Sequence, residues 1–132
     1  MIVYPNDNYD SYISEDNADL YFETRLNADA WINYTNKEAA LITAFNSINE
    51  LNLDIDPTES DQLQALQVAQ CEQALYELKM DSDFNQLEGV NLGGLLNVRF
   101  ETDGNSKPDR YSQRALALLE QYRSLNVITR TR

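Results

Sequence analysis

The chain has 132 residues, enough for one ordinary domain whose core needs no metal or disulfide. Its 42 % hydrophobic content argues against disorder, its net charge of −12 argues against tight binding of nucleic-acid phosphates, and its single cysteine indicates a reducing cytoplasm. We expect no membrane helix and no secretory signal, because no apolar run approaches about 20 residues and the first residues lack a basic region followed by an apolar stretch.

Residues 1–13 are predicted to form an extended N-terminal arm, because Pro5 and a cluster of Asn and Asp disfavour helix. Its apolar side chains are expected to lie either on the core of this chain or on a neighbouring chain. Tyrosine buries a large area and keeps a polar tip, so Tyr4, Tyr9 and Tyr12 are the candidate partner contacts of this arm.

The first helix is predicted over residues 15–26. Ser14 is a suitable N-cap, and apolar residues follow at helical spacing as far as Leu26. Residues 27–31 are predicted to form a turn or a short helical piece. It presents Trp31, which we expect to anchor the core or a loop rather than contact a partner.

The second helix is predicted over residues 36–51. Thr35 and Glu38 have the spacing of a capping box, in which each side chain satisfies an exposed backbone N–H, and one apolar stripe follows. Residues 52–60 contain Pro57 and several acids, so they are predicted to form a loop.

The third helix is predicted to start between residues 58 and 61 and to run to about residue 80. Its broad apolar face includes Cys71, which we expect to be a buried thiol rather than a nucleophile. Its other face is predicted to be either solvated or packed against a partner, and it carries five glutamines: Gln62, Gln64, Gln67, Gln70 and Gln73.

Partial alternation of apolar residues and an Asp-Gly turn signal predict a short β segment or hairpin at about 95–106. Pro108 suits the first turn of a fourth helix, expected to run to about residue 124. Residues 125–132 are predicted to form an extended C-terminal tail. The predicted fold is mainly α, a small four-helix bundle over residues 14–124 with extended arms at both ends and the β segment before the last helix.

No catalytic, cofactor or metal site is indicated. The chain has no histidine, which removes the commonest general base and metal ligand. Asp54, Asp56 and Asp61 do not match a calcium loop, because counting from Asp54 places Glu59 where glycine is required and Ala65 where glutamate is required. We therefore expect no enzymatic activity and no cofactor.

The charge is unevenly distributed. Residues 1–94 hold 18 acidic and 3 basic side chains, a net charge of −15, whereas residues 95–132 hold 4 acidic and 7 basic ones, a net charge of +3. An acidic body suits a surface past which DNA slides, but many unrelated proteins are acidic. The mixture that binds single-stranded DNA occurs only near the C-terminus, at Arg110, Tyr111, Arg114, Tyr122 and Arg123.

Residues 10–22, D-S-Y-I-S-E-D-N-A-D-L-Y-F, resemble the opening of the head–tail connector proteins of tailed bacteriophages, also called adaptor, neck or head-completion proteins. N-A-D-A-W at 27–31 and K-E-A-A-L-I-T-A at 37–44 resemble the next two elements of that family. G-G-L-L-N-V-R-F at 93–100 is similar to its extended piece before the last helix. The chain departs from the family at 51–57, where L-N-L-D-I-D-P replaces a segment that often contains Trp-Pro-Arg.

The resemblance implies a structural virion protein of the neck, made in the bacterial cytoplasm. It implies a homo-oligomeric ring, expected to be a dodecamer, beneath the portal protein. This ring continues the DNA channel without binding DNA specifically, contacts no membrane, and docks the tail or the next neck protein. Related sequences are often labelled primosomal-protein-T-like single-stranded DNA-binding proteins, so a DNA-binding module is the alternative. In the C-terminal part, partner contacts are predicted at Arg123, Ile128, Arg130 and Arg132.

Overall fold

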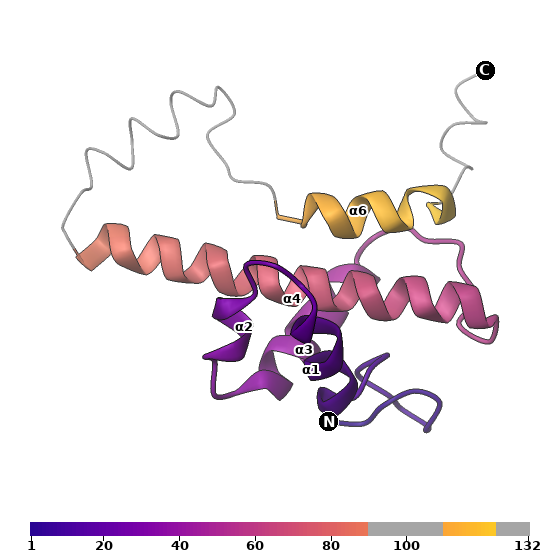
Figure 1. The fold of residues 1–132 in the computed structure, drawn as a ribbon. Coiled ribbons are helices and arrows are strands. Elements are labelled where there is room, and N and C mark those ends of the chain that lie inside the picture. Colours follow the sequence, from indigo (N-terminus) through magenta and orange to yellow (C-terminus); the bar gives the residue numbers. More distant parts are fainter. Residues whose placement is uncertain (90–109, 124–132) are drawn as a thin grey trace, which may run out of the picture.

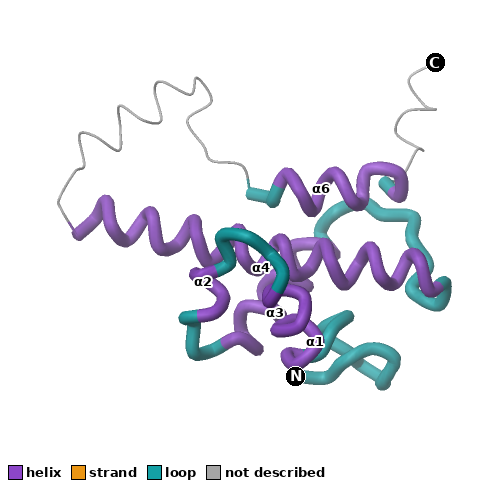
Figure 2. Tube along the Cα trace, viewed as in Figure 1, coloured by secondary structure: helices purple, strands orange, loops and turns teal. Residues whose placement is uncertain are grey.

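The structure is a computed structural model that describes residues 1–89 and 110–123, and only the backbone of 81–89. Within these residues the protein is mainly helical, with five α-helices, one 3-10 turn and no strand (Figure 2). Two isolated β-bridges also occur, between Val3 and Ser11 and between Leu53 and Arg123. The predicted β segment at 95–106 lies outside the described residues.

The longest helix, α4 (Ser60–Gly89), organises the fold. Figure 1 shows α6 running along one side of it and the shorter N-terminal helices lying on the other. Its start agrees with the prediction. It continues past the predicted end at about residue 80, because no glycine or proline interrupts the sequence before Gly89.

Helix α1 (Glu15–Glu23) begins as predicted, with the Ser14 hydroxyl accepting a hydrogen bond from the Asn17 N–H at 3.1 Å. It ends before the predicted residue 26. The chain turns there because Asn27 adopts a left-handed φ of 61°, which asparagine tolerates better than most residues. Leu26 is therefore 82 % exposed, and its predicted place on the apolar face was wrong.

Helix α2 (Asp29–Ile32) is the predicted short helical piece. Its Trp31 is 1 % exposed, and the indole stacks on the Phe22 ring with centroids 4.8 Å apart. The Trp31 Nε1–H donates to Asp19 Oδ1 at 2.9 Å, so the polar atom of the buried ring is satisfied. The prediction that Trp31 anchors the core is confirmed.

Helix α3 (Lys37–Asn49) has a different cap from the one predicted. The Asn36 side chain accepts a hydrogen bond from the Ala39 N–H at 3.2 Å, so Asn36 is the N-cap and the predicted Thr35–Glu38 capping box is wrong. Asparagine caps at least as well as threonine, which explains why the helix starts one residue later.

Helix α6 (Gln113–Leu119) starts later than predicted, and a 3-10 turn, η1 (Glu120–Tyr122), follows it. Its N-cap is Ser112, whose hydroxyl accepts from the Ala115 N–H at 3.2 Å. Pro108, the predicted first-turn residue, lies outside the described residues. The Tyr122 carbonyl then accepts from the Asp54 N–H at 2.6 Å, which ties the end of η1 to the loop before α4.

The core consists of two apolar clusters along α4. The first lies among α1, α2, α3 and α4, and its largest members are Phe22, Trp31, Leu41 and Leu75. Cys71 belongs to it and is fully buried, as predicted. The second lies among the N-terminal segment, α3, α4 and α6, and it includes Tyr12, Ile48, Leu66, Ala115 and Leu119.

The glutamine face of α4 is partly internal, because Gln70 and Gln73 are fully buried while Gln64 is exposed. Gln70 accepts from the Tyr12 N–H at 2.9 Å and donates to the Leu41 carbonyl at 2.8 Å. Gln73 accepts from the Ser112 N–H at 2.8 Å. The two buried glutamines thus contact neither solvent nor a partner chain but fasten other segments of the same chain to α4.

Candidate functional site

The three predicted arm tyrosines lie together on this chain's own core. Tyr12 is 6 % exposed, and Tyr4 and Tyr9 are half-buried against the second cluster. The ring centroids are 5.0 Å apart for Tyr4 and Tyr9, 5.7 Å for Tyr9 and Tyr12, and 4.9 Å for Tyr12 and Phe45. A partner contact through these tyrosines remains a prediction.

The N-terminal segment forms a closed loop, which differs from the predicted extended arm. The Tyr4 N–H donates to the Ser11 carbonyl at 2.9 Å, and the Asp10 N–H donates to the Ile2 carbonyl at 2.8 Å. Gln67 donates to the Tyr12 carbonyl at 3.0 Å, alongside the bond from the Tyr12 N–H to Gln70. Both backbone polar groups of Tyr12 are therefore hydrogen-bonded to side chains of α4.

Of the described basic residues near the C-terminus, Arg110 and Arg123 lie beside acids, whereas Arg114 is exposed. Arg110 pairs with Glu50 at 2.7 Å, and the Tyr111 hydroxyl donates to the same carboxylate at 3.4 Å. Arg123 is exposed and lies 3.9 Å from Glu120. The other predicted tail contacts, Ile128, Arg130 and Arg132, lie outside the described residues.

Exposed apolar side chains gather in a part of the chain that sequence reasoning did not single out. Among the described residues five large hydrophobic side chains are exposed, and four of them belong to α1, α2 and the loops that flank α2. We call these four the apolar surface around α2: Leu20, Leu26, Ile32 and Tyr34, exposed by 59, 82, 55 and 40 %. Four exposed large hydrophobic side chains within residues 20–34 make this part of the chain a candidate contact surface.

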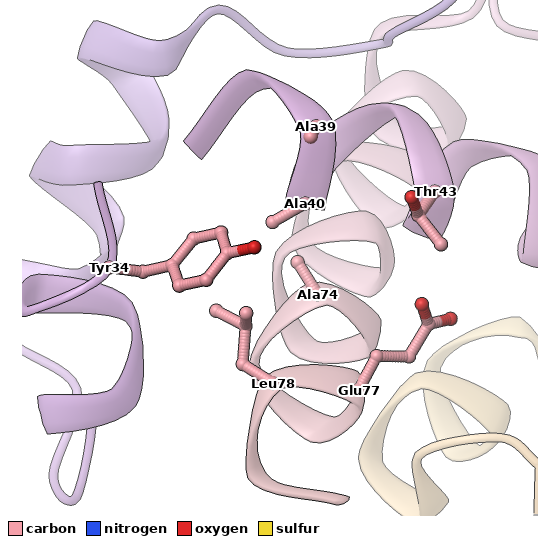
Figure 3. A pocket seen from close by; sticks show the side chains of 7 residues that line it. All are labelled: Tyr34, Ala39, Ala40, Thr43, Ala74, Glu77 and Leu78. Atoms are coloured by element: carbon pink, nitrogen blue, oxygen red, sulfur yellow. The ribbon is translucent and has the colours of Figure 1, made fainter. Parts of the chain in front are cut away.

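A hollow of about 280 Å³ lies beside this surface, between α3 and α4 (Figure 3). We call it the α3–α4 hollow. Its walls are Tyr34, three residues of α3 and three residues of α4, namely Ala39, Ala40, Thr43, Ala74, Glu77 and Leu78. Figure 3 shows the Tyr34 ring above Leu78 and beside Ala74, and the Glu77 carboxylate at the opposite end near Thr43.

The carboxylate in the α3–α4 hollow is positioned by its neighbours. Glu77 Oε2 accepts hydrogen bonds from the Ser47 hydroxyl at 2.6 Å and from Gln73 Nε2 at 2.7 Å. A carboxylate can accept about four hydrogen bonds, so these two leave capacity for a further donor in the hollow. The hollow is thus apolar at the Tyr34 end and negatively charged at the Glu77 end.

A second hollow of about 290 Å³ lies next to Trp31, and Ile32, Asp19, Glu23 and Lys37 line it. Lys37 Nζ lies 5.8 Å from the centre of the Trp31 ring, within reach of a cation–π contact. Lys37 already occupies the position over the indole that a cation of a ligand would take. This hollow therefore leaves a ligand less to bind than the α3–α4 hollow does.

Glu72, Arg25 and Tyr21 form a partly buried ionic cluster. Arg25 Nε and Nη2 donate to the two oxygens of Glu72 at 2.7 and 2.9 Å, and the Tyr21 hydroxyl donates to the same carboxylate. Burial alone raises the pKa of Glu72, but these hydrogen bonds and the Arg25 charge outweigh it, so the pKa lies below its ordinary value.

The partners of Glu72 are shifted as well. The pKa of Tyr21 is raised by burial and by the bond to Glu72, and the pKa of Arg25 is raised mainly by its bond to Glu72. Burial likewise raises the pKa of the Cys71 thiol to about 12. Each of these pKa shifts favours the form that the group already has at neutral pH: Glu72 and Arg25 are charged, and Tyr21 and Cys71 are neutral. Such shifts suit structural groups rather than a general base or nucleophile.

Sequence reasoning missed the α3–α4 hollow, although one signal was present. Small side chains at Ala39, Ala40 and Ala74 create the space, and small residues leave room wherever two helices meet. The sequence does not show that these positions face each other, because that depends on how α3 packs against α4.

Among residues 1–80 and 110–123, no group of three or more acidic or cysteine side chains has a geometry that would hold a metal ion, the aspartates at 54, 56 and 61 included. In the part of the chain that the structure describes, every helix is too short or too polar to cross a membrane. Compared with protein-family models, with curated proteins and with solved structures, the chain matches none of them.

Proposed function

We propose that this protein is a structural assembly subunit, a head–tail connector of a tailed-phage virion. It forms a homo-oligomeric ring beneath the portal protein, continues the DNA channel, and docks the tail or the next neck protein. The observation that carries the proposal is the concentration of exposed apolar side chains around α2. The resemblance of residues 10–22 to the openings of connector proteins supports it.

The proposal includes the finer fold expected from the sequence. The subunit is a small four-helix bundle, with α2 as an additional short turn, a β excursion at 95–106 and a C-terminal tail at 125–132. In the ring, the tail and the apolar surface around α2 supply contacts with neighbouring chains. The net charge of −15 in residues 1–94 suits a channel wall, because it repels DNA phosphates and lets the duplex pass.

Single-stranded DNA binding is the less supported alternative. It requires basic and aromatic side chains that are free to contact phosphates and bases. In the structure Arg110 and Tyr111 both contact Glu50, and Arg123 lies near Glu120. Glu50 and Glu120 would compete with DNA phosphates for these groups, whereas Arg114 is exposed on α6.

The test is the mass of the purified protein under native conditions, alone and with the portal protein of the same phage. A defined ring that joins the portal ring, seen also in images of the neck, is the expected result. A protein that stays monomeric with the portal and is absent from purified virions contradicts the proposal. Micromolar binding of a labelled single-stranded oligonucleotide that weakens steeply with salt would favour the alternative.

A further inference from the structure

We infer that the α3–α4 hollow binds the C-terminal segment, residues 124–132, of a second copy of this chain. The inference deepens the proposed function, since it names the partner of one surface, and it rests on that proposal for the idea that copies assemble. Three observations carry it. The hollow has an apolar end and a negatively charged end, the segment is basic, and Arg123, which precedes the segment, lies near the start of α4, far from the hollow.

The lining of the hollow suits a short peptide that carries one aliphatic and one cationic side chain. The volume of the hollow is about 280 Å³. Tyr34, Ala74 and Leu78 provide an apolar end for one aliphatic side chain. At the other end Glu77, held by Ser47 and Gln73, is aligned to accept hydrogen bonds from a guanidinium.

The C-terminal segment carries this pair of groups at a suitable spacing. Side chains two residues apart project from the same side of an extended peptide, roughly 7 Å from each other. Ile128 and Arg130 have that spacing, so an extended segment presents an aliphatic group and a cation together. Residues 124–132 contain two arginines and no acid, and they would approach a body whose residues 1–94 carry a net charge of −15.

A second copy is the occupant because the segment begins far from its own hollow. Arg123 forms a β-bridge with Leu53 in the loop before α4, and Leu53 and Leu63 both pack against the second core cluster. Leu63 lies near the start of α4, and Figure 1 shows η1 ending at that end of the helix. Leu78 lies 15 residues beyond Leu63, roughly 22 Å along the helix. Ile128 is five residues after Arg123 and reaches roughly 17 Å at full extension.

Sedimentation velocity of the full-length chain tests the inference with a matched pair of variants. Thr43 lines the hollow and Asn46 does not, yet both are exposed on α3. Thr43→Arg places a cation beside Glu77 and should weaken self-association about tenfold, whereas Asn46→Arg makes the same charge change and should leave it unaltered. Arg130→Glu should weaken self-association as Thr43→Arg does. Equal effects of T43R and N46R, or no effect of T43R, overturn the inference.

Disulfide cross-linking identifies the occupant directly, and the native Cys71 does not interfere because it is fully buried. Mixing the single variants Thr43→Cys and Thr129→Cys should give a cross-linked dimer, and mixing Asn46→Cys with Thr129→Cys should not. A cross-link within single monomers of the double variant T43C/T129C would assign the hollow to the chain's own tail. A chain that stays monomeric up to about 100 µM would leave it to a different partner. Either result overturns the inference.

These outcomes are separate from those of the proposed function. A protein that cross-links through Thr43 but never joins a portal ring keeps the inference and contradicts the connector proposal. A protein that joins the portal ring but cross-links equally through Asn46 and Thr43 contradicts the inference alone.

Discussion

The ion pair of Arg25 and Glu72 fixes the end of α1 against α4. Arg25 follows the helix in sequence, and its side chain, 16 % exposed, reaches a carboxylate that is 3 % exposed. Two hydrogen bonds join them, and Tyr21 from the last turn of α1 adds a third. A buried carboxylate in this setting depends on its partners, because an unpaired buried charge is strongly unfavourable.

Replacing Arg25 by methionine should therefore lower the free energy of unfolding by about 3 kcal/mol, since it leaves the Glu72 charge buried with only Tyr21 as a donor. Urea unfolding followed by circular dichroism measures this. The double variant R25M/E72Q removes the charge as well and should recover part of the loss. A single variant that unfolds like the wild type would show that Glu72 is solvated and that the pair has little structural role.

The same carboxylate predicts a pH dependence. The pKa of Glu72 in the folded protein lies below its ordinary value of 4.5, so its contribution to stability is fully present above about pH 4.5 and is lost as the pH falls through the folded pKa. The wild type should consequently lose more stability between about pH 5 and about pH 3 than Glu72→Gln does. Parallel losses in both proteins, measured by urea unfolding at each pH, would rule out this role for Glu72.

The cap of α3 gives a prediction that separates two neighbouring residues. Asn36→Ala should cost about 1 kcal/mol of stability, because the Ala39 N–H loses its acceptor. Thr35→Ala should change stability by less than about 0.5 kcal/mol, as expected for an exposed residue outside the cap. Thermal unfolding of the two variants checks this, and the reverse order would restore Thr35 as the cap.

At the scale of elements, α4 works as a scaffold through its buried amides. Gln70 binds the backbone of the N-terminal segment and of α3, and Gln73 binds the backbone before α6. Each glutamine replaces the main-chain partner that a strand or helix would have offered. This is how a chain without a sheet in its described residues satisfies buried backbone groups.

Gln70→Met should lower the free energy of unfolding by about 2 kcal/mol, because the Tyr12 N–H and the Leu41 carbonyl lose their buried partner. Gln64→Met on the exposed side of α4 is the control and should have almost no effect. Hydrogen exchange should show the Tyr12 amide exchanging faster in Q70M alone. Unchanged exchange at Tyr12 would mean that the ring contacts of Tyr12 hold the segment without Gln70.

Helix positions could be predicted from local signals, whereas helix ends depended on contacts that are distant in sequence. Ser14 and the start of α4 carried clear capping and periodicity signals, and both were predicted. Because α1 ends at Glu23, Arg25 lies outside the helix and contacts Glu72, which is 47 residues away in the sequence. The late start of α6 is likewise tied to Gln73, which binds the N–H of the cap residue Ser112. Neither contact has a local signature.

At the scale of the whole molecule, the candidate surfaces were less predictable than the core. Trp31 and Cys71 were expected inside and are inside, because apolar periodicity reports which face of a helix is buried. The apolar surface around α2 breaks that rule, since Leu20 and Ile32 lie on the outer sides of their helices. Only the packing of α1 and α2 shows which apolar residues remain uncovered.

Removing residues 125–132 should leave a folded subunit that no longer docks on its neighbour in the particle. The described core ends at η1, and the bond between Tyr122 and Asp54 lies before the deletion. Helical content should stay the same, and the free energy of unfolding should change by less than about 0.5 kcal/mol. Circular dichroism and electron microscopy of assembled particles check the two parts, and normal assembly would count against a docking role for the tail.

The bond between Tyr12 and Gln70 spans 58 residues, and this separation matters during synthesis. A ribosome releases residues 1–13 well before α4 has emerged, at a rate of about 5–20 residues per second. For that interval the Tyr12 N–H lacks its acceptor on Gln70, and the Tyr12 carbonyl lacks its donor on Gln67. Translation that stops before residue 70 would thus yield a chain whose tyrosine-rich beginning stays undocked and open to proteases or chaperones.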